Sequence, residues 1–428
     1  HNWDGYSFER GKNAYTYKPN NGRFVQWTWD IDFALGIDRG INPNLFGSND
    51  PRIVAMWQVP AIRRAYLRAF QDLVDGPWRT SVLLPLLDAK DKALRENNVT
   101  TDATQLNAIK NYISGEINQL TTTAAQGNAP FEVTVPTSIT TNNNLIVITG
   151  TAPIKIKDIL LNGQVIPVTW SGPNATTPTI WRVLLVAQPG QNVYNFTGND
   201  SQDKPVAGAG ATVTVNFTGP AVDPVDTVVF SEIMYNPTTP NASFVEIHNR
   251  SSNFSFDLSG WEINGLNFTF PVGTILTNGQ YLVVAKNLGA FSGAYAGNVN
   301  VAGEFDGNLD LDGETLTLVK PGANGGAALE VDKVRYEPGA PWNTNANGNG
   351  PSLQLIDAAQ DNSRSSNWSD GSGWRFFSYT GVAGSGGTRL FFWLTNVGDV
   401  FIDDIELVKG SAPGAGPNIV QNGGFETG

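Results

Sequence analysis

The sequence predicts a multidomain protein in which a helical N-terminal region is followed by several all-β modules. The chain has 428 residues, which is too long for one ordinary domain of roughly 100–150 residues. Apolar residues recur at helical spacing only in residues 1–128. Downstream, apolar residues alternate with polar ones, and clusters of Gly, Asn and Pro separate the alternating runs. The change of period near residue 129 therefore marks a change of fold class.

Three helices are expected in the first region. Pro60 suits the first turn of a helix that runs to Leu73, with an apolar stripe of Ile62, Tyr66, Phe70 and Leu73. A second helix is expected over residues 81–96, kinked or opened at Pro85. A third follows the expected N-cap Asp102 and keeps its apolar residues on one face: Leu106, Ile109, Ile113, Ile117 and Leu120. Residues 1–128 are therefore assigned to one helical region.

Residues 129–219 and 228–369 both have the pattern of all-β modules. In the first module, alternating runs such as 213–217 and frequent turns predict about seven short strands, which is typical of an immunoglobulin-like sandwich. Prolines in residues 219–224 indicate a stiff linker. In the second module, strands are expected at 228–234, 244–248, 268–270, 281–285, 316–319 and 331–336.

The remaining residues, 370–428, form a fourth segment. A stretch rich in Gly and Ser precedes two expected strands at 390–394 and 400–407. The chain ends soon afterwards, so we expect this segment to be part of a larger module. It is assigned to a partial β domain.

Composition excludes several classes of function. A formal net charge of −12 argues against nucleic acid as a partner, because phosphate binding needs clustered Lys and Arg. The absence of Cys excludes disulfides, thiolate metal sites and Cys nucleophiles. The longest apolar runs, such as 82–87, fall far short of the ~20 residues that cross a bilayer, so no transmembrane segment is expected. A chain poor in Lys and rich in Asn, Thr and Gly is typical of exported bacterial β-modules, so we expect an extracellular or cell-surface location.

Asp30 and Asp32 have the one spacing that suggests catalytic chemistry in the first region. They lie two residues apart at the end of an alternating run, so on a strand they share a face. Paired carboxylates repel each other unless a cation lies between them, and Mg²⁺ bound to phosphates would fit such a site. The structural alternative is a strand end whose acids cap a turn. Spacing alone favours this alternative.

The wider pattern adds weight to the metal interpretation. Three stretches resemble the second half of the CotH family of spore-coat and secreted kinase-like proteins: residues 2–5 (NWDG), 11–17 (GKNAYTY) and 29–36 (WDIDFALG). The resemblance implies an atypical kinase fold that moves the γ-phosphoryl group of ATP to protein hydroxyls with a divalent metal. It also implies that Asp4 and Asn13 belong to the catalytic-loop region, and that Asp30 or Asp32 holds the metal.

The chain departs from that family at its start. It begins at His1, so the lobe that covers the phosphates has no room, and no glycine-rich phosphate loop occurs elsewhere. We expect a leader or a larger N-terminal part to precede His1. Because positioning supplies most of the catalysis of phosphoryl transfer, the region is expected to be an inactive partial C-lobe. ATP and Mg are then expected only for the full-length protein, and no cofactor for this chain.

A second resemblance covers about 140 residues of the second β module. Residues 229–237 (VFSEIMYNP), 244–249 (FVEIHN) and 257–261 (DLSGW) resemble the opening of a lamin tail domain. Later pieces follow in the family order, among them 279–284 (GQYLVV), 332–336 (DKVRY) and 348–353 (GNGPSL). The resemblance implies an immunoglobulin-like sandwich, found beside enzymes and surface anchors in bacterial exported proteins, with a role in binding or attachment.

Two groups of acids in that module admit a functional interpretation. Glu232 and Glu246 could form a catalytic carboxylate pair, but strand-edge acids that accept backbone donors are the favoured interpretation because the family is not enzymatic. A second group could hold Ca²⁺, although it lacks the spacing of a helix-loop-helix calcium loop. A solvated acidic turn is favoured for this second group, which contains Asp306, Asp310, Asp312 and Glu314.

The other segments yield weaker inferences. Residues 184–186 and 189–194 resemble bacterial immunoglobulin-like spacers, which implies a mechanical role. Residues 401–407 (FIDDIEL) and 422–426 (NGGFE) resemble galactose-binding-like jelly rolls, which implies carbohydrate binding. A copper site formed by His1 would need His248, which belongs to another domain, so it is not favoured.

These inferences combine into one leading hypothesis. The chain is expected to be an exported surface or matrix protein whose β-sandwich domains attach or position it on a protein or polysaccharide partner, and which carries an incomplete CotH-like region. The first alternative is an active CotH-like protein kinase in the full-length protein. The second alternative is a glycan-binding module.

Overall fold

The computed structural model describes most of the chain. The described residues are 14–19, 25–28, 45–46, 50–173, 177–295, 297, 299–322, 325–371, 378–382, 390, 392, 402–410 and 415–424. The chain divides into two compact units, residues 1–221 (unit 1) and residues 222–428 (unit 2). Each unit is described below by itself. Among the described residues, no helix is long and apolar enough to cross a membrane.

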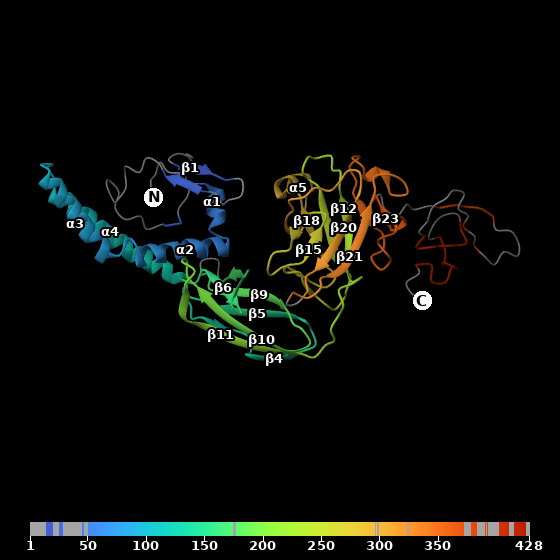
Figure 1. The fold of residues 1–428 in the computed structure, drawn as a ribbon, viewed down its shortest axis with the longest axis horizontal. Coiled ribbons are helices and arrows are strands. Elements are labelled where there is room, and N and C mark those ends of the chain that lie inside the picture. Colours follow the sequence, from blue (N-terminus) through green and yellow to red (C-terminus); the bar gives the residue numbers. More distant parts are fainter. Residues whose placement is uncertain are drawn as a thin grey trace. The chain divides into compact units, whose positions relative to one another are not determined.

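Unit 1 begins with a short hairpin and a group of helices (Figure 1). The hairpin pairs β1 (Ala14–Tyr17) with β2 (Val25–Thr28) in antiparallel fashion. The helices are α1 (Pro51–Met56), α2 (Pro60–Asp75), α3 (Thr80–Glu96) and α4 (Ala103–Ala124), and the short turn η2 (Ala125–Gly127) follows α4. The helical region predicted from the sequence is confirmed.

The capping of these helices follows from their sequence. Pro60 stands at the start of α2, where a missing N–H costs nothing. The Asp102 side chain accepts hydrogen bonds from the backbone N–H groups of Thr104 and Gln105, at 2.7 and 3.4 Å, which confirms it as the N-cap of α4. The helical backbone of α3 runs unbroken through Pro85, so the helix does not open there.

The buried face of α2 is rotated from the predicted one. The predicted stripe contains Ile62, Tyr66, Phe70 and Leu73, whereas the buried residues are Arg63, Arg64, Leu67, Phe70 and Val74. Two arginines can lie on the buried face because a planar guanidinium packs on aromatic rings. Arg63 lies 3.8 Å from the ring centroid of Phe46, and Arg64 lies 3.7 Å from that of Trp170.

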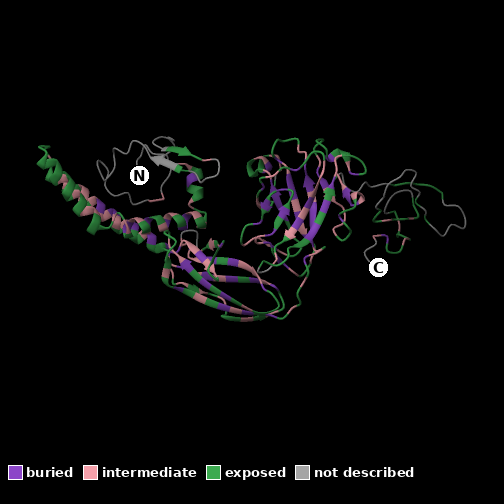
Figure 2. Ribbon diagram, in the orientation of Figure 1, coloured by how far each residue is buried: buried purple, intermediate pink, exposed green. Residues whose placement is uncertain are grey.

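The helical core is continued by a residue of the following sandwich. Leu67, Phe70 and Val74 of α2 pack with Leu120 and Ala124 of α4, and Ile154 completes the cluster. Helix α3 contributes no buried residue and lies along α4, where Lys110 forms an ion pair with Asp88 (Figures 1 and 2).

Two antiparallel sheets form the sandwich of unit 1. The first has the order β3-β5-β9-β8 and the second the order β4-β11-β10-β6-β7, with β4 parallel to β11. Trp181 and Phe196 are buried between them, with ring centroids 5.1 Å apart. The strands are β3 (Glu132–Val133), β4 (Ser138–Thr141), β5 (Leu145–Thr151), β6 (Asp158–Leu161), β7 (Gln164–Ile166), β8 (Thr169–Ser171), β9 (Ile180–Val186), β10 (Gly190–Asn199) and β11 (Pro205–Phe217). The predicted immunoglobulin-like class is confirmed.

Unit 2 is a second sandwich with its own core. Its six-stranded sheet, here called the β12 sheet, has the order β19-β18-β13-β12-β22-β23. It packs on a sheet of order β16-β15-β20-β21. The elements are β12 (Val228–Met234), β13 (Phe244–Asn249), β14 (Phe256–Asp257), β15 (Glu262–Asn264), β16 (Phe268–Thr269), β17 (Ile275–Leu276), β18 (Tyr281–Ala285), α5 (Leu288–Ala294), β19 (Val301–Glu304), β20 (Glu314–Lys320), β21 (Leu329–Tyr336), β22 (Leu353–Leu355) and β23 (Trp368–Ser369).

Alternation along the strands separates the two faces of the β12 sheet. Phe230 and Ile233 of β12 belong to the main core, as does Ile247 of β13. The register shifts between Phe230 and Glu232, so Ser231 forms a bulge and Glu232 faces away from the core. Phe244, Met234 and Val283 form a smaller cluster on the outer face, which α5 covers with Phe291.

The C-terminal predictions fall partly outside the described residues, and of the strand expected over 390–394 only residues 390 and 392 are described. Residues 402–407 are described and belong to no assigned strand, although a strand was expected over 400–407. Two backbone hydrogen bonds still pair this segment with the end of the chain. Ile405 N donates to Gly423 O at 2.7 Å, and Ile419 N donates to Leu407 O at 3.0 Å.

Candidate functional site

The residues predicted to carry kinase chemistry lie outside the described residues. Asp4, Asn13, Asp30 and Asp32 all belong to this group, and so does His1. In the sequence, β1 begins one residue after Asn13. The catalytic and metal-binding roles of these residues stay predictions.

A buried arginine joins the helical region of unit 1 to its sandwich. Arg64 is 1% exposed and projects from α2. Its Nη1 donates to the carbonyl oxygens of Gly127, Ala152 and Pro178, at 3.3, 3.4 and 3.0 Å. Its Nη2 donates to those of Pro153 and Ile156, at 2.5 and 3.3 Å. These carbonyls belong to η2 and to the loops of the sandwich, so one side chain connects both parts.

The electrostatics of Arg64 differ from those of an ordinary ion pair. Burial, with the nearby charge of Arg68 as a second cause, lowers the pKa of Arg64 to about 9. Five carbonyl dipoles and the face of the Trp170 ring take the place of a carboxylate. The guanidinium therefore remains charged at neutral pH, and its planar fork fixes the angle between α2 and the sandwich.

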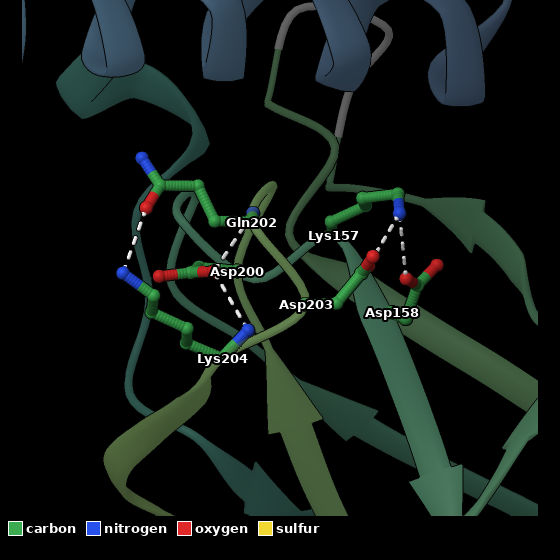
Figure 3. Close-up of polar contacts among 6 residues, drawn as sticks. All are labelled: Lys157, Asp158, Asp200, Gln202, Asp203 and Lys204. Carbon is green, nitrogen blue, oxygen red and sulfur yellow. Dashed lines mark hydrogen bonds and ion pairs between the residues drawn. The ribbon is translucent and has the colours of Figure 1, made fainter.

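A second polar cluster lies in the sandwich at the turn between β10 and β11 (Figure 3). Lys157 pairs with Asp158 at 3.1 Å and with Asp203 at 2.8 Å, and hydrogen bonds from Lys157 to Asp203 and Asp158 raise its pKa. Asp200 accepts from the backbone N–H groups of Gln202 and Lys204 at 2.9 and 3.0 Å, which lowers its pKa. The backbone donors to Asp200 close the turn, and Lys157 joins Asp203 of this turn to Asp158 at the start of β6.

Glu232 and Glu246 both lie on the outer face of the β12 sheet. The two residues lie directly opposite each other in the antiparallel register of β12 and β13. Glu232 Oε1 accepts from Ser352 Oγ in a short hydrogen bond and from Gln354 Nε2 at 3.3 Å. Glu246 Oε1 accepts from the bulged Ser231 at 2.9 Å. Both carboxyl groups thus have neutral hydrogen-bond donors.

Burial makes ionisation of this pair costly. It raises the pKa of Glu246 to about 7; the hydrogen bond from Ser231 opposes this shift, and the charge of Glu232 adds to it. Burial also raises the pKa of Glu232, against the effect of its hydrogen bonds from Ser352 and Gln354. From the sequence, these acids were expected to accept hydrogen bonds from backbone donors at strand edges, whereas the donors found are side chains.

Aromatic groups lie on the same outer face. The His248 ring stacks on Tyr281 with centroids 4.1 Å apart and planes inclined by 8°. Burial, with Arg250 as a second cause, lowers the pKa of His248. Tyr295, which packs on Phe244, has its pKa raised by burial and by the charge of Glu232.

The acidic turn of unit 2 is held by its own carboxylates. The backbone N–H of Asp310 donates to Glu314 Oε1 at 2.9 Å, and that of Asp312 donates to Asp310 Oδ1 at 2.9 Å. The Tyr336 hydroxyl donates to Glu314 Oε1 at 3.0 Å. Within the described ranges, no group of three or more His, Cys, Asp or Glu residues is placed to hold a metal ion.

Sequence reasoning missed the buried polar residues. The only sequence signal for Arg64 is a charged residue between Pro60 and Leu67, inside a predicted helix whose apolar residues recur at helical spacing. Asp332, which is 7% exposed, accepts from Phe230 N and from Asn362 Nδ2, both at 2.7 Å. No local signal marks Asp332, because its partners lie 102 and 30 residues away.

Comparisons with known proteins agree with the two resemblances. Residues 1–128 match the family model of the CotH kinase protein, and residues 221–338 match that of the Lamin Tail Domain. No curated protein matches the chain.

Two solved structures are similar to parts of the chain. The fibronectin(III)-like modules of Clostridium thermocellum CbhA share 22% identity, with 21% of this chain and 99% of that chain covered, at a TM-score of 0.17. Bacteroides ovatus SGBP-B of the mixed-linkage glucan utilization locus, in complex with a mixed-linkage heptasaccharide, shares 14% identity, with 46% and 41% covered, at a TM-score of 0.15. At these TM-scores neither similarity bears on function.

Proposed function

We propose that this chain, which joins a CotH region to a lamin tail domain, belongs to an exported modular protein whose β-modules hold the CotH region at a cell surface or polymer. The observation that carries the proposal is the joint formed by Arg64 in unit 1. A flexible linker would leave the CotH region free to rotate. Here a buried fork of hydrogen bonds holds it on the sandwich.

The joint supports a positioning role because a buried charge tolerates few arrangements. Moving Arg64 away from its carbonyls would leave either a bare buried cation or several carbonyls without donors. The contact of Ile154 with Leu67 and Phe70 adds an apolar component to the same joint. The sandwich therefore acts as a rigid base for α2 and the helices that pack on it.

The lamin tail domain is the proposed attachment module. It has its own core, which includes Phe230, Trp261 and Trp368, so it can present a surface without help from unit 1. The net charge of −12 argues against nucleic acid, so the proposed partner is a protein or a polysaccharide.

Fractionation of the native host tests this function. Tagged full-length protein is expected in the envelope or matrix fraction, and a form that lacks residues 222–428 is expected to lose most of that retention. An Arg79→Met variant, which changes an exposed residue of unit 1, serves as a control and should be retained like the wild type. Retention that is independent of residues 222–428, or a cytoplasmic protein, would reject the proposal.

A glycan array probed with the full chain identifies the kind of partner. Signal on particular polysaccharides would establish a glycan partner, as the resemblance of residues 401–407 to galactose-binding-like strands implies. A blank array, together with retention in the envelope fraction, would favour a protein partner.

Protein kinase activity is the second candidate, because the CotH match extends over residues 1–128. ATP with Mg²⁺ would supply the phosphoryl group and its charge neutralisation, with Asp4 and Asn13 in the catalytic loop and Asp30 or Asp32 on the metal. The test is transfer of the γ-phosphoryl group of labelled ATP by the longest native form of the protein. Transfer that is lost in Asp30→Ala or Asp32→Ala and kept in Asp75→Ala would establish this activity.

A further inference from the structure

The outer face of the β12 sheet holds two acids where a sheet ordinarily avoids them. Like charges directly opposite each other on antiparallel strands destabilise the pair. Glu232 and Glu246 occupy opposite positions, and their hydrogen-bonding partners Ser231 and Ser352 are 8% and 3% exposed. Solvent therefore screens the repulsion less than it would on an open surface.

The groups around the pair supply no neutralising cation. In the part of the chain that the structure describes, no Lys or Arg forms an ion pair with Glu232 or Glu246. The partners on this side are neutral: Ser352, which directly precedes β22, and Gln354 of β22. The guanidinium of Arg250 donates to the Ala358 carbonyl oxygen at 2.9 Å. The remaining titratable groups near the pair are His248 of β13, Tyr281 of β18 and Tyr295 after α5.

We propose that Glu232 and Glu246 form a carboxylate–carboxylic acid pair that holds one proton in weakly acidic solution and loses it through neutral pH, and that this loss weakens the lamin tail module. Hydrogen bonding decides which acid holds the proton. Glu232 accepts from two side chains, Ser352 and Gln354, which favours its ionised form. Glu246 accepts from Ser231 alone, so it is the protonated partner.

The element that responds is the edge of the β12 sheet formed by β22 and β23. Strand β22 meets β12 at two positions, Gln354 opposite Glu232 and Leu353 opposite Ile233. A second negative charge on Glu246 would act on Glu232 at this junction. The proposal concerns stability of the module and is independent of the attachment role.

The direction of the pH effect follows from linkage. The pKa of Glu246 in the folded state is raised to about 7, and an unfolded Glu titrates near ~4.3. The unfolded state therefore loses its proton first, and stability falls as the pH rises from ~4.3 to about 7. His248 acts in the opposite sense, because a lowered pKa destabilises the folded state on the acid side of its titration.

Hydrogen exchange of the full chain, read by mass spectrometry, isolates Glu246 from these other groups. Wild type and Glu246→Gln are compared at the same pH, which cancels the intrinsic pH dependence of exchange. Peptides that cover residues 228–234, 244–249 and 352–355 report on the junction. The ratio of wild-type to variant opening constants is expected to rise ~3- to 10-fold between pH 6 and pH 8, because Gln keeps the neutral state.

Two further variants make the result decisive. Glu262→Gln changes an exposed acid on β15 in the other sheet, and its ratio should stay constant over the same range. Glu232→Gln removes the neighbouring charge, so the module should then respond less to pH than the wild type does. If Glu246→Gln fails to fold, this comparison carries the test. A ratio that is flat or falls between pH 6 and pH 8, or an undiminished response in Glu232→Gln, overturns the proposal.

Discussion

Arg64 shows how one residue can join two folds that local sequence patterns treat separately. Its guanidinium lies among carbonyls from residues up to 114 positions away. An aliphatic residue on the same face of α2 could bury apolar area but could not donate to these carbonyls. The carbonyl oxygens of Gly127, Ala152 and Pro178 thus receive donors from Arg64 of α2, whereas Pro153 O also accepts from Ile156 N at 3.0 Å.

We expect Arg64→Met to destabilise unit 1 by about 3 kcal/mol or more, because it leaves the buried carbonyls of Gly127, Ala152 and Pro178 without this donor. Arg64→Lys should recover only part of the loss, since an ammonium lacks the planar fork. Urea unfolding measures the loss of stability, and hydrogen exchange of peptides from α2 and β9 shows where it acts. Arg79→Met is the matched control and should change stability by less than ~0.5 kcal/mol. Equal stability of Arg64→Met and the control would refute the role of the joint.

Asp332 is a buried charged residue of unit 2 that, like Arg64 in unit 1, joins distant parts of the chain by hydrogen bonds. Burial raises its pKa, and hydrogen bonds from Phe230 N and Asn362 oppose the shift. Asp332→Ala strips both donors of their acceptor and should cost about 2–4 kcal/mol. Glu330→Ala, on the exposed side of the same strand, should be nearly neutral. Calorimetry of the full chain distinguishes the two variants, and a neutral Asp332→Ala would contradict the assignment.

The candidate site could be foreseen only in part. Glu232 and Glu246 stand in motifs that the sequence makes visible, and their places on strands at 228–234 and 244–248 were predicted. Ser352 and Gln354 lie 120 and 122 residues after Glu232 in the sequence. The hydrogen bonds that distinguish the two acids could therefore not be predicted. The roles of Asp4, Asn13, Asp30 and Asp32 are still predictions from resemblance.

At the scale of elements, hydrophobic periodicity and capping residues were enough to predict the long elements. The expected strands at 228–234 and 281–285 coincide with β12 and β18. Short elements such as β14 and β17, with two residues each, are too brief to show a period and were missed. The rotated face of α2 has a different cause. A periodicity analysis counts Arg as polar, whereas in the folded protein its flat guanidinium packs on aromatic rings.

Helix α4 depends on its N-cap because little else holds its start. Asp102 is exposed and caps two N–H groups, while the buried residues of α4 begin at Ile113. Asp102→Ala should therefore cost about 1 kcal/mol and fray the first turns. Faster hydrogen exchange in residues 103–110, with residues 113–124 unchanged, is the expected result. Thr101→Ala is the control, and an equal effect from it would argue against the cap.

At the scale of the whole molecule, the two units keep their apolar cores separate. The main core of unit 2 contains buried residues from Val228 to Trp368, and the partly buried Val222 packs against it. The core that joins the helices to the sandwich of unit 1 ends at Ile154. Cooperative unfolding follows shared burial, so each unit is expected to be a folding unit of its own.

Separate expression of residues 1–221 and 222–428 tests this independence. The cut keeps Val222 with the core it packs against, and it falls between Pro220 and Pro224, in a segment whose prolines limit the shared backbone hydrogen bonds. We expect the calorimetric trace of the full chain to equal the sum of the two fragment traces, because each apolar cluster described above draws its residues from one unit. Arg64→Met should then shift only the transition of fragment 1–221, and Asp332→Ala only that of fragment 222–428. A full chain whose transitions are displaced from both fragments would show that the units stabilise each other.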